Sequence, residues 1–386
     1  MSGPTAANEL GPAEPVDLCV IGAGPGGIAA AVAAADSGLR VTLVDRGRFP
    51  RGKVCGGCLN GRAIAALHRL RLSDTLERAV PTDRLRLGHR GRAAELPLPP
   101  GTAISRLAWD ARLIAAARDR GVDVRTQTLA KLQPAGTRDR HRRIRLTSVA
   151  DSPAASETLQ ASLVISADGL TQSATRSESS VRTRIRGGSR IGAGCLFEAA
   201  DADDASFVPP GAIAMATSGE GYVGMVRVEN GRLNVAAALD PDAVRGRTLA
   251  EATAAILQSA GWPVPDRWHA ADWSGTPPLT RGTQSPAVWR VACVGDAAGY
   301  VEPFTGEGMA WALAAGEAAG QAAADWIGEP DRLESEWPPR FRRLVARRRL
   351  ICRGVAAALR RPRLCGLLMP AAAPLVRLAT ARMNRV

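Results

Sequence analysis

Six residues near the amino terminus have the composition and spacing of a loop that binds phosphate. The run Gly22-Ala23-Gly24-Pro25-Gly26-Gly27 contains the pattern G-x-G-x-x-G with one additional glycine, Gly26. In such a loop the first glycine permits a tight turn, the second lets the backbone approach a pyrophosphate, and the third packs a helix on a strand. Asp45 follows Gly22 by 23 positions, where a carboxylate can accept the ribose hydroxyls of an adenosine. These residues predict a dinucleotide site.

The flanking pattern supports this interpretation because it places the glycines between a strand and a helix. Residues 16–21 are rich in β-formers, residues 28–35 are rich in alanine and are followed by Gly38, and residues 41–44 form an apolar run that ends at Asp45. The pattern predicts a strand, a helix and a second strand within about thirty residues, which is the context that a dinucleotide-binding turn requires. A glycine turn in an ordinary unit of this kind is the alternative.

Two more predicted strands end in acidic residues. The buried run 163–165 leads into Asp168-Gly169, and the run 288–294 leads into Gly295-Asp296. A helix is expected to open near Gly306 and to run through Trp326. In sheets of parallel strands connected by helices, ligands bind beyond the carboxyl ends of the strands. Asp168 and Asp296 are therefore candidates for the same site.

The middle of the chain predicts a second sheet. Residues 104–120 have the pattern of an amphipathic helix, and residues 122–124 and 144–146 suggest a small antiparallel ribbon. From residue 191 to residue 239 the pattern is β-rich, and the pair Asn230-Gly231 is a strong hairpin signal. This change of pattern predicts a separate sheet and a second domain.

The glycine-rich loop between residues 50 and 59 holds two thiols and a rare lysine. Lys53 is one of only two lysines among 50 basic side chains, and Cys55 and Cys58 form a C-x-x-C pair. The pair could be a redox dithiol or half of a zinc site, but no second pair of cysteines or histidines follows at ligand spacing. We therefore expect no metal. Seven scattered cysteines make no disulfide framework, which favours a cytoplasmic protein.

The positive charge of this chain is concentrated at its carboxyl end. The net charge is +13, and thirteen arginines but no acidic residue lie from Arg340 onward, which leaves 37 basic side chains to balance 37 acidic ones in the rest. Nucleic-acid binders spread their charge over a folded face, so we expect no nucleic-acid partner. The tail alternates arginines with apolar residues, which is typical either of a basic helix at an anionic membrane or of a helix docked on its own core. The apolar run 364–376 is too short to span a bilayer.

The strand-end motifs together resemble the FAD-dependent oxidoreductases of the p-hydroxybenzoate hydroxylase fold. More closely, Lys53-Val-Cys-Gly-Gly and the run from Gly295-Asp296 through Tyr300 to Gly306, Gly308 and Met309 are similar to the geranylgeranyl reductase branch, which shares these loops with flavin-dependent halogenases. The resemblance covers about residues 16–325. It implies an α/β fold in which an interrupted Rossmann-type FAD-binding domain (1–80, 101–180 and 286–328) carries an inserted β-sheet substrate domain (81–100 and 181–285) and a basic helical tail (329–386).

The resemblance also implies roles for single residues. The glycine turn would hold the pyrophosphate, Asp45 the adenosine ribose, and Asp296 a ribityl hydroxyl. The helix that opens at Gly306 would present the N–H groups of Gly308 and Met309 to the flavin edge where charge accumulates on reduction. Further cofactor contacts would come from Arg46, Gly56, Arg106, Ala130, Asp168, Gly169 and Gly295.

Cys55 would lie beside the flavin ring, where its thiol could donate a proton while Lys53 lowers its pKa. The alternative is a small residue that merely lets the loop approach the ring. Tyr222 and Tyr300, the only tyrosines of the chain, are candidates for the substrate cavity, and packing in the core is the competing interpretation.

Three activities fit these features. The first is hydride transfer between reduced FAD and a hydrophobic, isoprenoid or polyketide-like substrate, with NAD(P)H as a transient donor. The second is a single-component aromatic monooxygenase, and the third is a flavin electron carrier to quinone. In the geranylgeranyl reductases one substrate strand carries the motif Tyr-x-Trp-x-Phe-Pro. The corresponding residues here, Tyr222-Val-Gly-Met-Val-Arg227, lack the Trp, Phe and Pro, so this strand does not predict specificity for prenyl groups. The expected location is the cytoplasm, with peripheral attachment to the inner face of the membrane through residues 340–386 as a further hypothesis.

Overall fold

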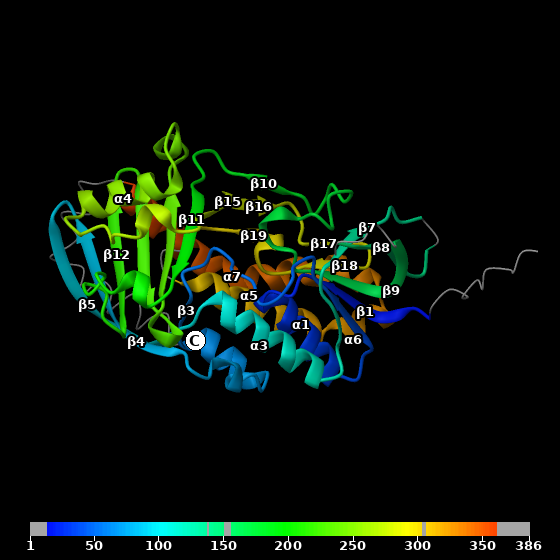
Figure 1. The fold of residues 1–386 in the computed structure, drawn as a ribbon. Helices are drawn as coiled ribbons and strands as arrows, with labels where there is room; N and C mark the ends of the chain where they lie inside the picture. Colours follow the sequence, from blue (N-terminus) through cyan, green and yellow to red (C-terminus); the bar gives the residue numbers. More distant parts are fainter. Residues whose placement is uncertain (1–13, 137–138, 150–155, 303–305, 361–386) are drawn as a thin grey trace, which may run out of the picture.

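Two large sheets lie at opposite ends of an elongated molecule, and helices run between and beneath them (Figure 1). The computed structural model describes residues 14–136, 139–149, 156–302 and 306–360. The predicted fold class is confirmed, because the chain forms an α/β structure with two sheets and carboxyl-terminal helices. The domain boundaries given above stay a prediction.

The first sheet has a parallel centre in which the strand order reverses. Its strands follow the order β18-β9-β1-β2-β6, and all neighbouring pairs are parallel. From β1 the chain first proceeds to β2 and β6 on one side and later to β9 and β18 on the other. Such a reversal leaves a crevice at the carboxyl ends of the two central strands, here β1 and β9. The bounds are β1 (Val16–Ile21), β2 (Val41–Val44), β6 (Asp123–Arg125), β9 (Ser156–Ser166) and β18 (Val291–Cys293).

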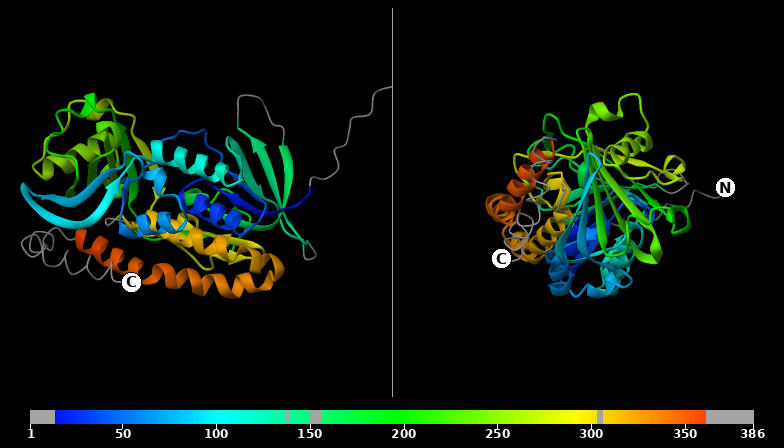
Figure 2. Two further views of the ribbon diagram at one scale, coloured as in Figure 1. Left: turned by 90° about the horizontal axis from the view of Figure 1, so that it is seen from below. Right: turned by 90° about the vertical axis from the view of Figure 1, so that its left-hand side faces the viewer.

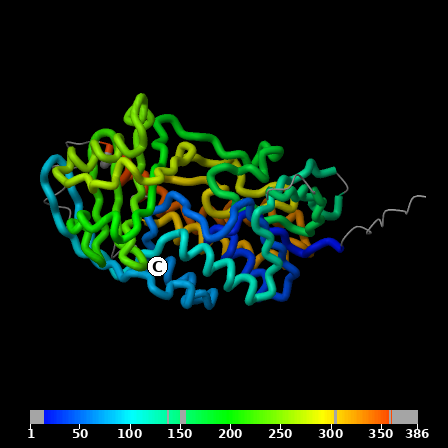
Figure 3. Tube along the Cα trace, viewed as in Figure 1, coloured from blue at the N-terminus to red at the C-terminus, as the bar shows by residue number. Residues whose placement is uncertain are grey.

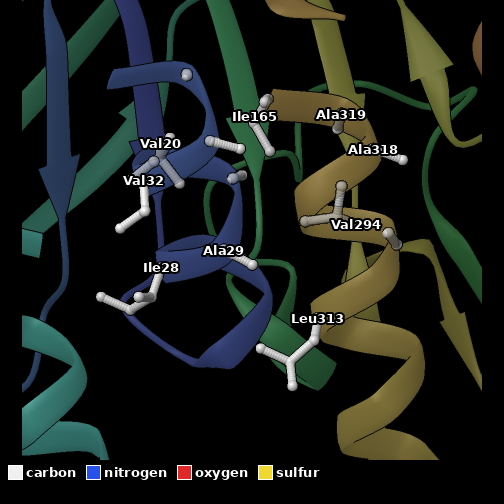
Figure 4. Packing of buried hydrophobic residues seen from close by; sticks show 14 of the residues in the cluster. Val20, Ile28, Ala29, Val32, Ile165, Val294, Leu313, Ala318 and Ala319 are labelled. Atoms are coloured by element: carbon white, nitrogen blue, oxygen red, sulfur yellow. The ribbon is translucent and has the colours of Figure 1, made fainter. Parts of the chain in front are cut away.

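Both faces of this sheet are covered, which explains the unbroken apolar runs of its strands. Alternate residues of β1 pack against the helices α1 (Pro25–Asp36), α3 (Arg106–Asp119) and α5 (Glu307–Gln321), and the others pack against the ribbon formed by β7 (Thr128–Leu132) and β8 (Arg142–Ser148). Figure 4 shows the helix side, where α1, with Ile28 and Ala29, lies beside α5, with Leu313, and Val20 of β1 belongs to the same buried cluster. The core of the molecule therefore lies directly behind the glycine turn.

The second sheet is mostly antiparallel and contacts the first through connecting loops. Helix α4 (Leu249–Ser259) packs against the face that lies away from the first sheet. Figure 3 follows the trace as it crosses to this sheet before β4 and again after β9. In spatial order the strands are β15 (Ser274–Pro278), β11 (Ile191–Phe197), β14 (Leu233–Leu239), β13 (Gly221–Arg227), β12 (Ala212–Ser218), β4 (Val80–His89), β5 (Arg92–Ala103) and β3 (Cys58–Leu59).

Short elements complete the fold. A small sheet of β10 (Thr183–Ile185), β16 (Arg281–Thr283) and β19 (Gly299–Tyr300) bridges the two large ones. The remaining elements are α2 (Gly61–Arg69), α6 (Ala323–Gly328), α7 (Asp331–Leu359) and β17 (Ala287–Val288).

Helix α7 runs along the length of the molecule from the first sheet to the second (Figure 2). Its apolar side is buried: Leu333 and Trp337 are fully buried, and Phe341, Val345 and Cys352 nearly so. The indole of Trp337 donates a hydrogen bond to the carbonyl of Cys293 over 3.0 Å. The described part of the basic tail is thus a helix docked on its own core. Residues 361–386, which include the apolar run 364–376, lie outside the described residues.

The structure differs from three details of the predicted elements. Residues 123–125 pair in parallel with β2, so the antiparallel ribbon is formed by β7 and β8 instead. The run 288–294 is split into β17 and β18 by a turn at Arg290, whose φ is +54°. The helix that opens at Gly306 breaks at Ala322, where α5 ends and α6 begins. The hairpin at Asn230 and Gly231 is confirmed, and both residues have positive φ.

Candidate active site

The glycine turn after β1 is folded so that one face of it stays open. Gly22 has a φ of +106°, and a Cβ there would lie 2.4 Å from the carbonyl oxygen of Ala167. A Cβ on Gly27 would lie 1.8 Å from the Gly22 oxygen. At Gly24, by contrast, the only neighbour is a guanidinium nitrogen of Arg106 at 3.7 Å. The first and third glycines therefore let the turn pack, and the second leaves a free surface.

Two helices begin at this free surface without a side chain to cap them. Helix α1 follows Gly24 and α5 follows Gly306, and neither N-cap residue offers a side-chain hydrogen bond. The first N–H groups of a helix have no partner within it and carry a partial positive charge. Two uncapped helix ends in one site are suited to binding anionic groups.

Asp45, at the end of β2, ties this turn to its surroundings. Its carboxylate accepts hydrogen bonds from the N–H groups of Ala23 (2.8 Å) and Gly47 (2.7 Å) and pairs with Arg51 at 3.2 Å. Sequence reasoning missed Arg51, although its position two residues before Lys53 was a signal. One buried nitrogen of Arg51, Nε, has no hydrogen-bond partner, so this side chain has a donor to spare for a ligand.

Two cationic side chains besides Arg51 converge on the turn. Arg106, at the start of α3, forms a buried bidentate pair with Asp110, with N–O distances of 2.6 and 2.7 Å. The Lys53 ammonium lies 3.5 Å from the point that a Cβ of Gly169 would occupy. It faces the cavity interior, and enclosure by the walls, reinforced by Arg106, lowers the pKa of Lys53. These positive charges favour an anionic ligand.

Asp168 and Asp296 lie at the ends of β9 and β18, beside the end of β1. The Asp168 carboxylate accepts hydrogen bonds from the Ser166 hydroxyl (2.9 Å) and the Ala174 N–H (2.8 Å), while burial raises the pKa of Asp168. Asp296 interacts electrostatically with Lys53. The strand-end acids are thus brought together, as the sequence predicts.

Cys55 lies where the second uncapped helix begins. Its thiol contacts the sulfur of Met309 at 3.8 Å, and its backbone carbonyl accepts a hydrogen bond from Asn234 of the second sheet over 2.9 Å. The cation that interacts with the Cys55 thiol is Arg106, whereas Lys53 interacts with Arg106, Arg51 and two aspartates. Burial raises the pKa of Cys58 to about 12, and none of the six cysteines in the described residues forms a disulfide.

A single cavity of about 670 Å³ joins these groups to the second sheet. With the exception of Gly27, which packs α1 on β1, every site residue predicted from the sequence lines it. From the first half of the site these are Gly22, Gly24, Gly26, Asp45, Arg46, Lys53, Cys55, Gly56, Arg106, Ala130, Asp168, Gly169, Gly295, Asp296, Gly306, Gly308 and Met309, and from the second half Tyr222 and Tyr300. Helix α7 adds Ile351 and Val355, which sequence reasoning missed because an amphipathic pattern does not reveal what its apolar side covers.

The two ends of the cavity differ in charge. All charged lining residues come from the first sheet, the loop after β2 and α3. The lining residues of the second sheet carry no charge, and Tyr222 and Tyr300 belong there to an apolar cluster with Leu85, Leu96, Met215 and Leu279. A charged, elongated ligand fits one end and a neutral apolar one fits the other.

The model of the family described as FAD binding domain matches residues 15–323. The chain belongs to this family. The cofactor is therefore FAD, and the uncapped helix ends, the open glycine and the surrounding cations are suited to its pyrophosphate. Among the residues that the structure describes, no helix is both long and apolar enough to cross a membrane.

Sequence relatives of this flavoenzyme include two menaquinone reductases. That of Mycobacterium tuberculosis is 28% identical over 392 residues, which cover 95% of this chain and 89% of the relative. That of Mycolicibacterium smegmatis is 40% identical over 111 residues, a match that spans only 27% of either chain. A flavin-dependent brominase has a similar fold, with a TM-score of 0.75, 14% identity and coverage of 95% of this chain and 93% of the brominase.

Proposed function

We propose that this flavoenzyme passes hydride between reduced FAD and a neutral hydrophobic substrate of the prenylated quinone class. The observation that carries the proposal is the absence of charge among the cavity-lining residues of the second sheet. A substrate with a carboxylate, a phosphate or an ammonium group would leave that charge unpaired in an apolar chamber, at a cost of several kcal/mol. A quinone or an isoprenoid chain has no such group.

The cofactor would occupy the charged end of the cavity. FAD supplies a hydride donor and acceptor when it is bound. The α1 end and the glycine turn would hold its pyrophosphate, Arg106 would balance the phosphate charge, and the α5 end would face its ring. The adenosine would lie along Asp45, Arg46 and Ala130, and the remaining contacts would come from Asp168, Gly169, Gly295 and Asp296.

The names of the two relatives support the quinone class, because a menaquinone is a neutral ring with an apolar prenyl chain. The loops at Lys53 and at Gly295 resemble the geranylgeranyl reductase branch, which also favours an isoprenoid. Gly224, a cavity-lining residue of β13, stands where that branch has a tryptophan, and the side chain of Met215 lies next to it.

Cys55 is our candidate for a group that acts beside the flavin ring, because its thiol lies against Met309 at the start of α5. Arg106, which interacts with the thiol, would fix its orientation. NAD(P)H is the proposed electron donor. Attachment to an anionic membrane surface is proposed through the exposed arginines of α7, among them Arg342, Arg343 and Arg347, which point away from the buried side of the helix.

Anaerobic reoxidation tests the proposal. Photoreduced holoenzyme is mixed with 2-methyl-1,4-naphthoquinone, a prenylated menaquinone, a prenyl lipid and a phenolic polyketide, and the flavin absorbance is followed. We expect reoxidation by the quinones without oxygen. If reoxidation needs dioxygen and the product gains an oxygen atom, the enzyme is a monooxygenase and the proposal is wrong.

A charged substitution in the apolar end of the cavity tests whether the absence of charge there determines which substrate binds. Leu279→Arg introduces a cation into the apolar end and should abolish reoxidation by quinone while FAD stays bound. Leu350→Arg is the matched control, because Leu350 is 68% exposed and lies outside the cavity lining. Equal quinone reactivity of the two variants would contradict the assignment of the chamber.

A further inference from the structure

A buried ion pair adjoins the apolar end of the cavity. Arg190 is fully buried and Glu302 is 1% exposed, and they approach to 3.0 Å. Removing two such charges from water costs more than their attraction commonly returns, so stability alone does not account for the pair. Its position next to the substrate chamber points to a function.

The pair is part of a network that reaches the surface. Arg190 also contacts both carboxylate oxygens of Asp240, at 3.2 and 3.3 Å, and Asp240 is 29% exposed. Arg360, directly after α7, approaches the second oxygen of Glu302 to 3.4 Å and is 36% exposed. Glu302 is therefore enclosed by protein, but on one side only the partly exposed Arg360 separates it from solvent.

Tyr222 connects this network to the cavity. Its ring lies in the cavity wall, and the guanidinium of Arg190 stands 5.7 Å from the ring centre. The hydroxyl donates a hydrogen bond to Glu302. The other ionisable groups around Tyr222 are Tyr300 and Cys352. Tyr222 is thus a proton donor at the chamber wall with a carboxylate behind it.

We infer that Tyr222 protonates a carbonyl oxygen of the substrate and that Glu302 returns a proton to Tyr222 from solvent. This inference rests on the proposed function and narrows it to substrates whose reducible bond is conjugated to a carbonyl, as in a quinone. Hydride arrival pushes an electron pair onto the carbonyl oxygen. The Tyr222 hydroxyl, which donates to Glu302 at rest, turns to the substrate oxygen, its O–H bond breaks and the substrate O–H bond forms. The Glu302 carboxylate then takes up one proton from solvent and passes it to the phenolate. Arg190, above the ring, offsets the transient negative charge.

Tyr222→Phe removes the proton and little else. With 2-methyl-1,4-naphthoquinone as the probe, we expect anaerobic reoxidation of the reduced enzyme to slow by about 100-fold or more, the usual contribution of a general acid, and to lose its solvent deuterium isotope effect. Apoprotein provides a second measurement: quenching of tryptophan fluorescence should show the quinone bound about 2- to 10-fold more weakly, the effect of one lost hydrogen bond.

Glu302→Gln is a second variant that tests the proton relay if Tyr222→Phe does not fold. It should reduce the isotope effect and the rate while the apoprotein still binds the quinone. Glu229→Gln is the matched control, because Glu229 is a glutamate of similar burial, 3% exposed, that bonds to Ser105 outside the cavity lining and should keep the wild-type isotope effect.

The outcomes separate the two claims. A wild-type enzyme that no quinone reoxidises would refute the proposed function. A wild-type enzyme that reacts with quinone, together with Tyr222→Phe and Glu302→Gln variants that react at the same rate with the same isotope effect, would overturn the relay and leave the function in place.

Discussion

Gly24 and Gly27 lie three residues apart in one turn, yet their replacement by alanine should fail in opposite ways. A Cβ on Gly24 meets only Arg106, at 3.7 Å, and the backbone there (φ −80°, ψ 176°) suits any residue. A Cβ on Gly27 would lie 1.8 Å from the backbone oxygen of Gly22. Gly24→Ala therefore places a methyl group in the cofactor end of the cavity, whereas Gly27→Ala disrupts the packing of the turn.

The expected magnitudes follow from these contacts. The Gly24→Ala substitution lowers the conformational entropy of the unfolded chain, which stabilises the folded apoprotein by about 0.4–1 kcal/mol. Alanine is a poorer N-cap residue than glycine, and this destabilises the folded apoprotein by a similar amount. The melting temperature of the Gly24→Ala apoprotein should therefore barely change. The added methyl group displaces the phosphate from at least one N–H donor. One such charge-assisted hydrogen bond is worth about 1.5–3 kcal/mol, which weakens FAD binding by about 10- to 150-fold.

Gly27→Ala should instead destabilise the apoprotein by about 1–3 kcal/mol or more, because the overlapping atom is backbone and cannot rotate away. Thermal unfolding of both apoproteins and FAD titration by flavin fluorescence measure the two effects separately. The reasoning is refuted if Gly24→Ala lowers the melting temperature as much as Gly27→Ala does, or if it binds FAD as tightly as the wild type.

Three further outcomes are expected. Asp296→Ala should weaken FAD binding by about 10-fold in the same titration, because it removes the acceptor for one hydroxyl, whereas unchanged affinity would exclude this contact. The thiol of Cys58, whose pKa is raised to about 12, should be almost entirely protonated at pH 8 and should react with iodoacetamide only as the pH rises toward that value; fast alkylation at pH 8 would contradict the raised pKa. Reversing the exposed charges of Arg342, Arg343 and Arg347 to glutamate should reduce sedimentation with anionic liposomes at low salt without lowering the melting temperature, and unchanged sedimentation would remove α7 as the membrane contact.

Much of the cofactor end could be predicted because each of its parts obeys a local rule. A glycine turn between a strand and a helix, and acids at strand ends, need only a few consecutive residues to be recognised, and parallel strands bring their carboxyl ends to one edge. For the same reason Asp168 and Asp296 were predicted together although 128 positions separate them.

Other features depend on distant packing, which the local pattern does not contain. Residues 123–125 place one apolar side chain between two charged ones, which fits a ribbon or a sheet edge, and only the position of β2 decides between them. The cation that interacts with the Cys55 thiol is Arg106, which begins α3, and this contact depends on where α3 docks. The contribution of Ile351 to the cavity depends on where α7 docks, and Ile351 follows Gly27 by 324 positions.

The contact between α1 and α5 explains how one site can hold both ends of a long cofactor. A Cβ on Gly316 would lie 2.1 Å from the carbonyl oxygen of Gly26, and one on Gly320 would lie 2.3 Å from that of Ala30, so the two helices touch at their backbones. Side chains can change rotamer under strain, but backbone in contact with backbone cannot yield in that way. The separation of the two uncapped helix ends, each with its partial positive charge, is therefore fixed by the fold and not by the ligand. A molecule that carries phosphate at one end and a ring that gains charge on reduction at the other can use both ends at once, whereas a shorter anion can use only one.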